Sequence, residues 1–481
     1  MRLRAAHALL LLPVLACVWP GDATWINDEP RIIAFARWAN ETGSIPVHGI
    51  MGSKGLAYGP FPVWFYSILL RFRPDLETLV VARAALSAAC VAASLAWLAS
   101  TLGGFSPAAI AAVLFSPYLW IYNRQLWDNN LLVPLSALVL AAYASFCAKP
   151  RAPALWTAVT GAALMFLTHP MGLALTVPIT LHFILFHRGW ARAHPGAVGW
   201  PCLAAALVTG PYLAYFLSHA GGALAAGESV SPWPGLLVPL GGGNYFSARG
   251  LDSFFGPGWP FVTGSRAAPV AAAAAWVSRA AVPATAIGAV VVAMRLWNRW
   301  NRGSRFTPAE HLGLVGLGAV VAQAALAVLA RSYGHPHYFN ATWCCYFLFL
   351  ATALGSRFRR PAARLAAGLA AGVWAASLGI VMVAMVWTTH ATGGNQFPQW
   401  GPALRTQVGV IARLGSWDPG SRVLLDAPNY RRFPDSFEVL KVLCARPGRG
   451  RRPVGDLVVR HASANPQIGW LVVEERNPSR R

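Results

Sequence analysis

The stretch Trp25-Ile-Asn-Asp-Glu-Pro-Arg31 places two adjacent acidic residues directly after the first apolar run of the chain. That run covers residues 4–20, and a loop of mixed polarity continues to residue 78. Charged side chains are costly in the middle of a bilayer, so an acidic pair at the end of a hydrophobic helix is expected at a membrane face. We therefore interpret the rest of the sequence as a scaffold that holds Asp28 and Glu29 at that face.

The composition is that of a membrane protein. Of 481 residues, 56% are hydrophobic and only 12% are charged, and the mean hydropathy is +0.46. Soluble domains carry about 25% charged residues, and several apolar runs here reach the ~20 residues that a helix needs to cross a bilayer. The net charge of +22 comes from short basic clusters between apolar runs, as the positive-inside rule requires. The sequence therefore predicts an all-α polytopic membrane protein with no nucleic-acid partner.

The basic residues also predict the topology. Arg2 and Arg4 place the N-terminus in the cytoplasm, whether residues 4–20 are a cleaved signal peptide or, as we favour, a retained anchor. The apolar segment 60–73 is short for a span, and treating it as an interfacial amphipathic helix keeps the basic clusters 295–305 and 357–364 inside. The outer loop 21–78 then carries the acidic pair.

This choice predicts about eleven membrane-spanning helices of a first domain, residues 1–390. The predicted spans are 4–20, 79–101, 106–122, 131–148, 154–168, 172–187, 198–218, 272–296, 311–331, 338–355 and 365–389.

After the last predicted span, the long apolar runs give way to short runs typical of strands. Three short runs of strand type, 422–426, 456–460 and 470–474, and one helical run, 434–444, predict a small α/β domain over 391–481. Because the N-terminus is predicted inside and eleven is an odd number of spans, this domain is expected on the extracytoplasmic side of the inner or plasma membrane.

Acidic residues give a partly independent test of the topology. Ten of the 17 precede residue 400, only Glu310 falls on the inner side, and none falls in the middle of a span. Proton-coupled transporters usually keep a carboxyl group at the bilayer midplane. The distribution therefore favours chemistry at the outer interface over transport.

Seven cysteines lie mostly inside apolar runs and show no spacing typical of a metal site. We assign no role to them. They are Cys17, Cys90, Cys147, Cys202, Cys344, Cys345 and Cys444.

A resemblance to a known family starts from the acidic stretch. Asn27-Asp-Glu-Pro-Arg31 after a first span resembles the first outer-loop motif of the GT-C superfamily of membrane glycosyltransferases, in particular its protein O-mannosyltransferase-like and aminoarabinose-transferase-like families. The resemblance implies an enzyme that moves a sugar from a polyprenyl phosphate to an acceptor hydroxyl at the outer face.

Four further segments carry the resemblance, which is thinner beyond residue 220. They are Gly52-Ser-Lys54 with Tyr58-Gly-Pro-Phe-Pro62, Ser116-Pro117 with Arg124 and Asp128, Phe166-Leu-Thr-His-Pro170, and Arg331 to Tyr338. The resemblance implies that Lys54, Tyr58, Arg124, Arg331 and Tyr338 contact the donor phosphate. Interfacial snorkelling or anchoring would explain these side chains equally well.

Elementary chemistry assigns roles to the acids. Transfer to a hydroxyl needs a base near the attacking oxygen, and a carboxylate in a partly dry site is suited to that task. We expect Asp28 to be catalytic, with helix capping as the alternative. Glu29 orients the acceptor, binds a metal or favours the start of the next helix. Asp128 is a third catalytic candidate or a solvated turn residue.

Three histidines, His169, His335 and His337, map to the same face. Together with the acids they form a possible divalent-metal site, although no local spacing supports it and no cofactor is certain.

The sequence as a whole predicts an inverting glycosyltransferase. The alternatives are a lipid or polysaccharide transporter and a non-catalytic scaffold. The sugar and the acceptor, which is a lipid, a glycan or a protein, are not encoded in a recognisable motif.

Overall fold

The computed structural model describes most of the chain. The described residues are 7–26, 28–52, 55–73, 75–225, 233–256, 268–331, 335–355, 360–395, 400–414, 423–426, 456–463, 465, 468–469 and 471–476.

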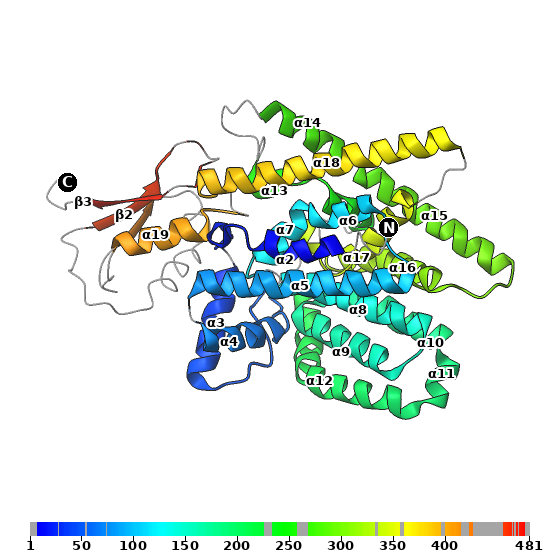
Figure 1. Ribbon diagram of the computed structural model, residues 1–481. Helices are drawn as coiled ribbons and strands as arrows, with labels where there is room; N and C mark the ends of the chain where they lie inside the picture. The colour runs from blue at the N-terminus through cyan, green and yellow to red at the C-terminus, as the bar shows by residue number, and fades with distance from the viewer. Residues whose placement is uncertain are drawn as a thin grey trace.

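Helices dominate this part of the chain (Figure 1). Those before residue 226 are η1 (His7–Leu10), α2 (Leu11–Ala16), η2 (Pro20–Asp22), α3 (Asp28–Thr42), α4 (Phe61–Phe72), α5 (Leu76–Leu102), α6 (Pro107–Leu114), α7 (Pro117–Arg124), η3 (Asn129–Leu131), α8 (Leu132–Ala148), α9 (Ala152–Thr168), η4 (Pro170–Gly172), α10 (Leu173–Phe186), α11 (Arg188–Ala193) and α12 (Pro195–Ala225). Those after it are η5 (Trp233–Phe246), α13 (Asp252–Phe255), α14 (Ala268–Ser278), α15 (Ala281–Asn301), α16 (Pro308–Leu329), η6 (Pro336–Phe339), α17 (Trp343–Leu354), α18 (Pro361–Thr392) and α19 (Leu404–Leu414).

The predicted membrane class is confirmed. Among the described residues, six helical segments are long and apolar enough to cross a bilayer, and five shorter apolar helices accompany them. Each of the eleven predicted spans contains helix, while the number of crossings stays a prediction. The chain is an integral membrane protein in which most helices pack around one extended apolar core, while α3, α4 and the start of α5 share a second, smaller one.

The predicted span 106–122 is broken into two helices. Residues 106–122 form α6 and α7, because Ser116 caps a new helix by accepting the Leu119 N–H at 3.1 Å, and Pro117 follows it. The Ser116 hydroxyl also donates to the Tyr245 carbonyl at 2.7 Å. A serine cap followed by proline starts a helix, so this break is visible in the sequence once the Ser-Pro pair is given that weight.

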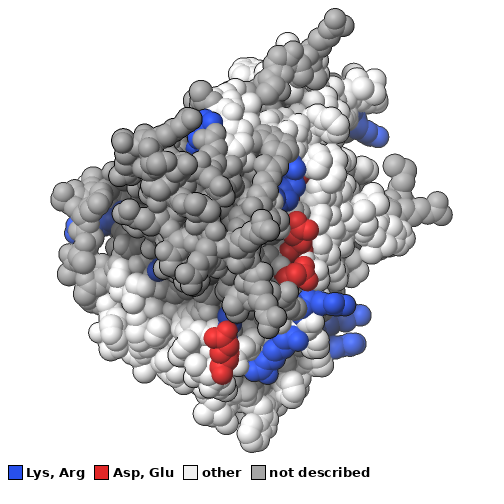
Figure 2. Space-filling view, turned by 90° about the vertical axis from the view of Figure 1, so that its left-hand side faces the viewer, with Lys and Arg blue, Asp and Glu red and all other residues white. Residues whose placement is uncertain are grey.

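The two ends of the helix bundle differ (Figure 1). Helix α5 has 27 residues and is therefore about 40 Å long. Beside its N-terminal end lie α3, α4 and α19, whereas α11 lies toward the opposite end. Figure 2 looks onto the first of these ends, where acidic and basic side chains are exposed close together.

The segment 60–73 forms the helix α4, which packs against α3 beside α5. Asn40 donates to the Ser67 carbonyl at 2.9 Å, and the Ser67 hydroxyl donates to the Ala36 carbonyl at 3.2 Å. Phe72 at the end of α4 is 77% exposed. The pair α3–α4 is thus a small helical unit attached to the bundle, in keeping with the interfacial helix that the sequence predicts.

The three predicted strands are confirmed. They are β1 (Val423–Asp426), β2 (Asp456–His461) and β3 (Leu471–Arg476), in the order β1-β2-β3. Strands β1 and β2 are parallel and β2 and β3 antiparallel. The predicted helix 434–444 lies outside the described residues. Helix α18 continues to Thr392, just past the predicted domain boundary, and the division at 390/391 stays a prediction.

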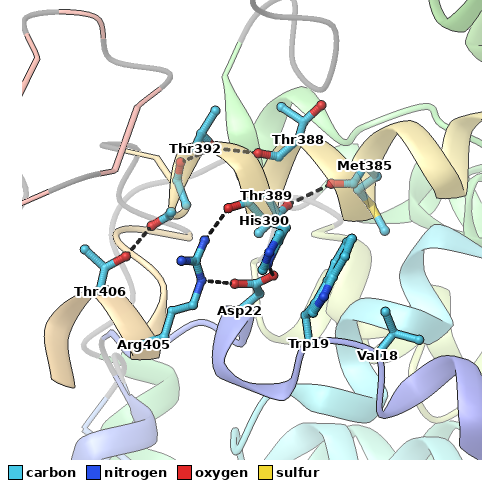
Figure 3. Close-up of polar contacts among 12 residues, drawn as sticks. Val18, Trp19, Asp22, Met385, Thr388, Thr389, His390, Thr392, Arg405 and Thr406 are labelled. Carbon is cyan, nitrogen blue, oxygen red and sulfur yellow. Dashed lines mark hydrogen bonds and ion pairs between the residues drawn. The ribbon is translucent and has the colours of Figure 1, made fainter. Parts of the chain in front are cut away.

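A buried ion pair fastens the C-terminal segment to the start of the chain (Figure 3). The Asp22 side chain is only 1% exposed and accepts from the guanidinium of Arg405 in α19 and from His390 Nδ1 at 2.9 Å. Arg405 also donates to the His390 carbonyl, and the Trp19 ring stacks on the His390 ring with centroids 3.9 Å apart. The start of the chain and two neighbouring segments near residue 400 therefore share one polar cluster.

Replacing Arg405 with methionine is expected to destabilise the protein by about 3 kcal/mol, because it leaves the buried Asp22 carboxylate with one fewer partner. Thermal unfolding of the purified protein in detergent measures the effect. Arg192→Met, at an exposed position on α11, is the matched control. Equal melting temperatures for the two variants would contradict the prediction.

Candidate active site

A cavity of about 540 Å³ opens between the start of α3, the α7–α8 connection and η6. Its volume lies within the range usual for small-molecule sites. Eight of the eleven residues proposed from the sequence line it: Asp28, Glu29, Tyr58, Asp128, His169, His335, His337 and Tyr338. Segments more than 300 residues apart thus meet here.

Asp28 is the first residue of α3, and two side chains hold its carboxylate. Arg31 Nη1 donates to Oδ1 at 3.0 Å, and Trp127 Nε1 donates to Oδ2 at 2.9 Å. Arg31 Nη2 donates in turn to the Met51 carbonyl at 3.2 Å. These contacts fix the orientation of the carboxylate, as a positioned base requires.

Glu29 and Asp128 are more deeply buried than Asp28. Glu29 is 4% exposed and Asp128 2% exposed. Burial raises the pKa of Glu29 to about 8, and the nearby Asp28 adds to the rise. Burial followed by Asp28 also raises the pKa of Asp128 well above its usual range. At neutral pH the cavity therefore holds an ion-paired carboxylate beside carboxyl groups that favour their neutral form.

The two oxygens of Asp128 differ. Oδ1 accepts the Asn129 N–H at 2.7 Å, whereas Oδ2 is buried and has no hydrogen-bond partner among the residues that the structure describes. A buried polar atom without a partner costs free energy. Such an atom in a cavity wall is suited to bind a polar ligand.

Tyr58 and His169 form the opposite wall. Their ring centroids lie 4.4 Å apart. Tyr58 belongs to a short hairpin in which its N–H donates to the Ile50 carbonyl at 2.9 Å, and the Gly49 N–H donates to its carbonyl at 2.7 Å. The hairpin rests on the end of α9, where a Cβ on Gly59 would lie 1.9 Å from the Leu167 carbonyl oxygen. Glycine at this position thus allows Tyr58 to reach His169.

Replacing Gly59 with alanine is expected to push the hairpin away from α9 and to destabilise the protein by roughly 1–3 kcal/mol. Thermal unfolding in detergent measures this, and the rate of any transfer reaction should fall because Tyr58 moves. Gly210→Ala is the control, since a Cβ on Gly210 meets nothing within 4 Å. A Gly59→Ala protein that melts like the control would contradict the close packing.

The hydrogen bond of His169 sets its tautomer. Its Nδ1 accepts the Met171 N–H at 3.1 Å, and burial lowers the pKa of its imidazole to about 3. A neutral imidazole that accepts at Nδ1 carries its proton on Nε2. In this tautomer His169 offers the cavity a hydrogen-bond donor rather than a lone pair for a metal ion.

His335 and His337 lie on the third wall with nearly parallel rings whose centroids are 5.4 Å apart. The His337 ring also meets the Trp127 ring edge-on at 4.7 Å, and burial lowers its pKa well below the usual value. Among the described residues, the one trio of possible ligands with atoms within 4.8 Å of one another lies elsewhere. A divalent metal in this cavity stays a prediction.

Two of the proposed phosphate ligands do not line the cavity, and a third lies outside the described residues. Arg124 is fully buried and donates to the carbonyls of Val18 and Trp19, with its guanidinium 4.1 Å from the centre of the Trp120 ring. It fastens the N-terminal segment to α7 and does not line the cavity. Arg331 follows α16 by two residues, is exposed and is not among the residues that line the cavity. Lys54 lies outside the described residues.

The two side chains that donate hydrogen bonds to the Asp28 carboxylate were not proposed from the sequence. Arg31 follows Asp28 by three residues, the spacing of an ion pair on one helix face, so its role was readable from the motif. Trp127 was not, because only the fold brings its indole to a carboxylate 99 residues earlier.

Comparison with known proteins addresses the fold. No family model matches the chain, and no curated protein matches it by sequence. Among solved structures, ArnT from Cupriavidus metallidurans bound to undecaprenyl phosphate superposes with a TM-score of 0.52 at 12% identity, over 96% of this chain and 86% of ArnT. The chain has the fold of this ArnT structure.

The apo state of the same ArnT superposes over the same shares with a TM-score of 0.51. The predicted resemblance is thereby confirmed for the architecture. At 12% identity the match does not assign the residues of the cavity.

Proposed function

We propose that this protein is an inverting glycosyltransferase that moves a sugar from a polyprenyl phosphate to a hydroxyl group at the extracytoplasmic face. One observation carries the proposal. Asp28, Asp128 and the segment 335–338 line a single cavity at one end of a GT-C fold. The ArnT structure of this fold is bound to undecaprenyl phosphate, which supports a polyprenyl lipid as the donor here.

Asp28 is the proposed base. Its carboxylate would take the proton of the acceptor hydroxyl as that oxygen attacks the anomeric carbon. The bond between the anomeric carbon and the phosphate oxygen breaks in the same step, so the configuration inverts and polyprenyl phosphate leaves. Arg31 and Trp127 hold the carboxylate in one orientation, as their hydrogen bonds support.

The phosphate would lie against the donors of the other walls. Tyr58, Tyr338 and the Nε2–H of His169 would offer neutral hydrogen bonds, and Arg31 would offer positive charge. We propose that Lys54, which lies outside the described residues, adds a second positive charge. Glu29 and Asp128 favour their protonated forms. In that form they do not repel an anion, and each presents an O–H donor.

The proposed orientation places the cavity outside. The exposed basic residues Arg188 and Arg192 lie in α11, at the end of the bundle opposite α3 (Figure 1). The positive-inside rule assigns that end to the cytoplasm. Tagging of the N-terminus and of α11 with reporters of sidedness tests the orientation.

Purified protein in liposomes with a radiolabelled polyprenyl-phosphate sugar tests the function. A transferase consumes the donor and releases polyprenyl phosphate when a membrane extract supplies the acceptor, and Asp28→Asn does not. A transporter would instead move the intact labelled lipid across the bilayer. Absence of donor consumption with every polyprenyl-phosphate sugar tried would overturn the proposal.

A further inference from the structure

A second cluster of reactive side chains lies at the other end of the bundle. Cys147 is near the C-terminal end of α8, His182 is in α10, His187 follows α10, and His311 is in the first turn of α16. Asp128 precedes η3 and α8, whereas Cys147 lies in the last turn of α8, and 19 residues of helix correspond to about 28 Å. This cluster is therefore separate from the candidate active site.

The spacing of the side-chain atoms is that of a metal site. The ligand atoms of Cys147, His182 and His187 all lie within 4.8 Å of one another. Cys147 Sγ is 3.7 Å from His187 Nε2, and His182 Nε2 is 3.0 Å from His311 Nδ1. Tetrahedral zinc, with Zn–S of about 2.3 Å and Zn–N of about 2.0 Å, separates its ligand atoms by roughly 3.3–3.6 Å.

The three imidazole rings form a nearly regular triangle. The ring centroids are 5.0 Å apart for His182 and His311, 5.7 Å for His187 and His311, and 5.8 Å for His182 and His187. A tetrahedral ion bound to one nitrogen of each ring would separate the centroids by roughly 5 Å. His311 is close to His182 but is not part of the trio whose ligand atoms lie within 4.8 Å of one another, so its ring would have to shift toward Cys147 and His187 for the ion to bind.

We propose that Cys147, His182, His187 and His311 bind one transition-metal ion of the zinc class. One thiolate and three imidazoles are a donor set that zinc accepts, whereas magnesium and calcium prefer oxygen ligands. Coordination displaces the thiol proton to solvent.

The surroundings of the cluster are consistent with this use. The Tyr143 hydroxyl lies 2.7 Å from His182 Nδ1, and a partner on one ring nitrogen orients the other toward a metal. The arginines at 188 and 192 are exposed, so solvent screens their charge. Glu310 forms an ion pair with Arg299, whose Nε donates to the Glu310 carboxylate at 2.9 Å.

The site would tie together the ends of three helices. Cys147 belongs to α8, His182 to α10 and His311 to α16, and the metal bonds would connect them at the end distant from the candidate active site. The ion has no part in the transfer chemistry, and its expected effect is on stability.

Metal binding to the full-length protein in detergent tests the proposal. After chelator treatment, we expect one equivalent of Zn²⁺ to bind and to raise the melting temperature. Co²⁺ should bind in its place and produce a thiolate-to-metal charge-transfer absorption. Cys147→Ser should remove this absorption, and His187→Ala should weaken Zn²⁺ binding at least tenfold.

Three controls separate this site from others. Cys202→Ser and His194→Ala change exposed residues and should leave the absorption intact. His337→Ala changes the outer cavity, which offers no thiol among its described lining residues, and should leave it intact as well. A wild-type protein without the charge-transfer absorption, or a Cys147→Ser protein that retains it, would overturn the proposal.

Discussion

Replacing Asp28 with asparagine is expected to lower the rate of sugar transfer by roughly 10²–10⁴-fold, the usual contribution of a positioned general base. Asparagine keeps the shape of the side chain, but its single amide oxygen can accept only one of the two hydrogen bonds that Arg31 and Trp127 donate to the two oxygens of Asp28. The backbone of α3 and the remaining walls of the cavity are unchanged, so the affinity for the donor lipid should change less than the rate. The loss should appear in kcat rather than in KM, because the base acts on the acceptor proton in the transition state.

Glu41→Gln is the matched control for this substitution. Glu41 belongs to the same helix, α3, but is exposed at its far end. Rates measured with the radiolabelled donor should be those of the wild type for Glu41→Gln. An Asp28→Asn enzyme with full kcat would eliminate Asp28 as the base and leave the cavity without an assigned one.

The second large effect concerns the dependence of stability on pH. Glu29 keeps its proton to about pH 8 in the folded protein, whereas its ordinary pKa is 4.5. Between these values the folded state binds more protons than the unfolded chain, so the free energy of unfolding falls as the pH rises. The difference corresponds to a loss of about 5 kcal/mol across this range as an upper, order-of-magnitude figure.

Glu29→Gln is expected to remove most of this loss. The variant should melt close to the wild type near pH 5, where Glu29 is protonated, and clearly above it near pH 8.5. Some slope should persist, because the pKa of Asp128 is raised as well. Melting temperatures across this range measure the effect, with Glu41→Gln again as the control. A variant whose melting temperature parallels the wild type at every pH would show that Glu29 is not held neutral.

Asp28→Asn should also change the dependence of stability on pH. Asp28 contributes to the raised pKa of both Glu29 and Asp128. Asp28→Asn removes that negative charge and should therefore lower both pKa values, so its stability should decline less steeply with pH than that of the wild type. Coupling of this kind follows from the cavity alone and needs no substrate.

Local patterns determined much of the architecture. Apolar runs of spanning length became helices, and the three short runs of strand type near the end of the chain became β1, β2 and β3. The position of Asp28 at the start of a helix follows from the Asp-Glu-Pro motif, because acids and proline favour the first turn. These features depend on neighbours within a few residues.

Long-range packing decided the rest. Arg124 and Trp127 are three residues apart, yet one fastens the N-terminal segment and the other donates to Asp28. Cys147 and His311 show no motif spacing, yet helix packing brings both into one cluster. By itself the sequence determined a helical membrane protein with an acidic outer loop, because hydrophobicity and charge act locally. Only the tertiary structure decided which polar groups meet, because contacts between distant segments depend on how whole helices pack.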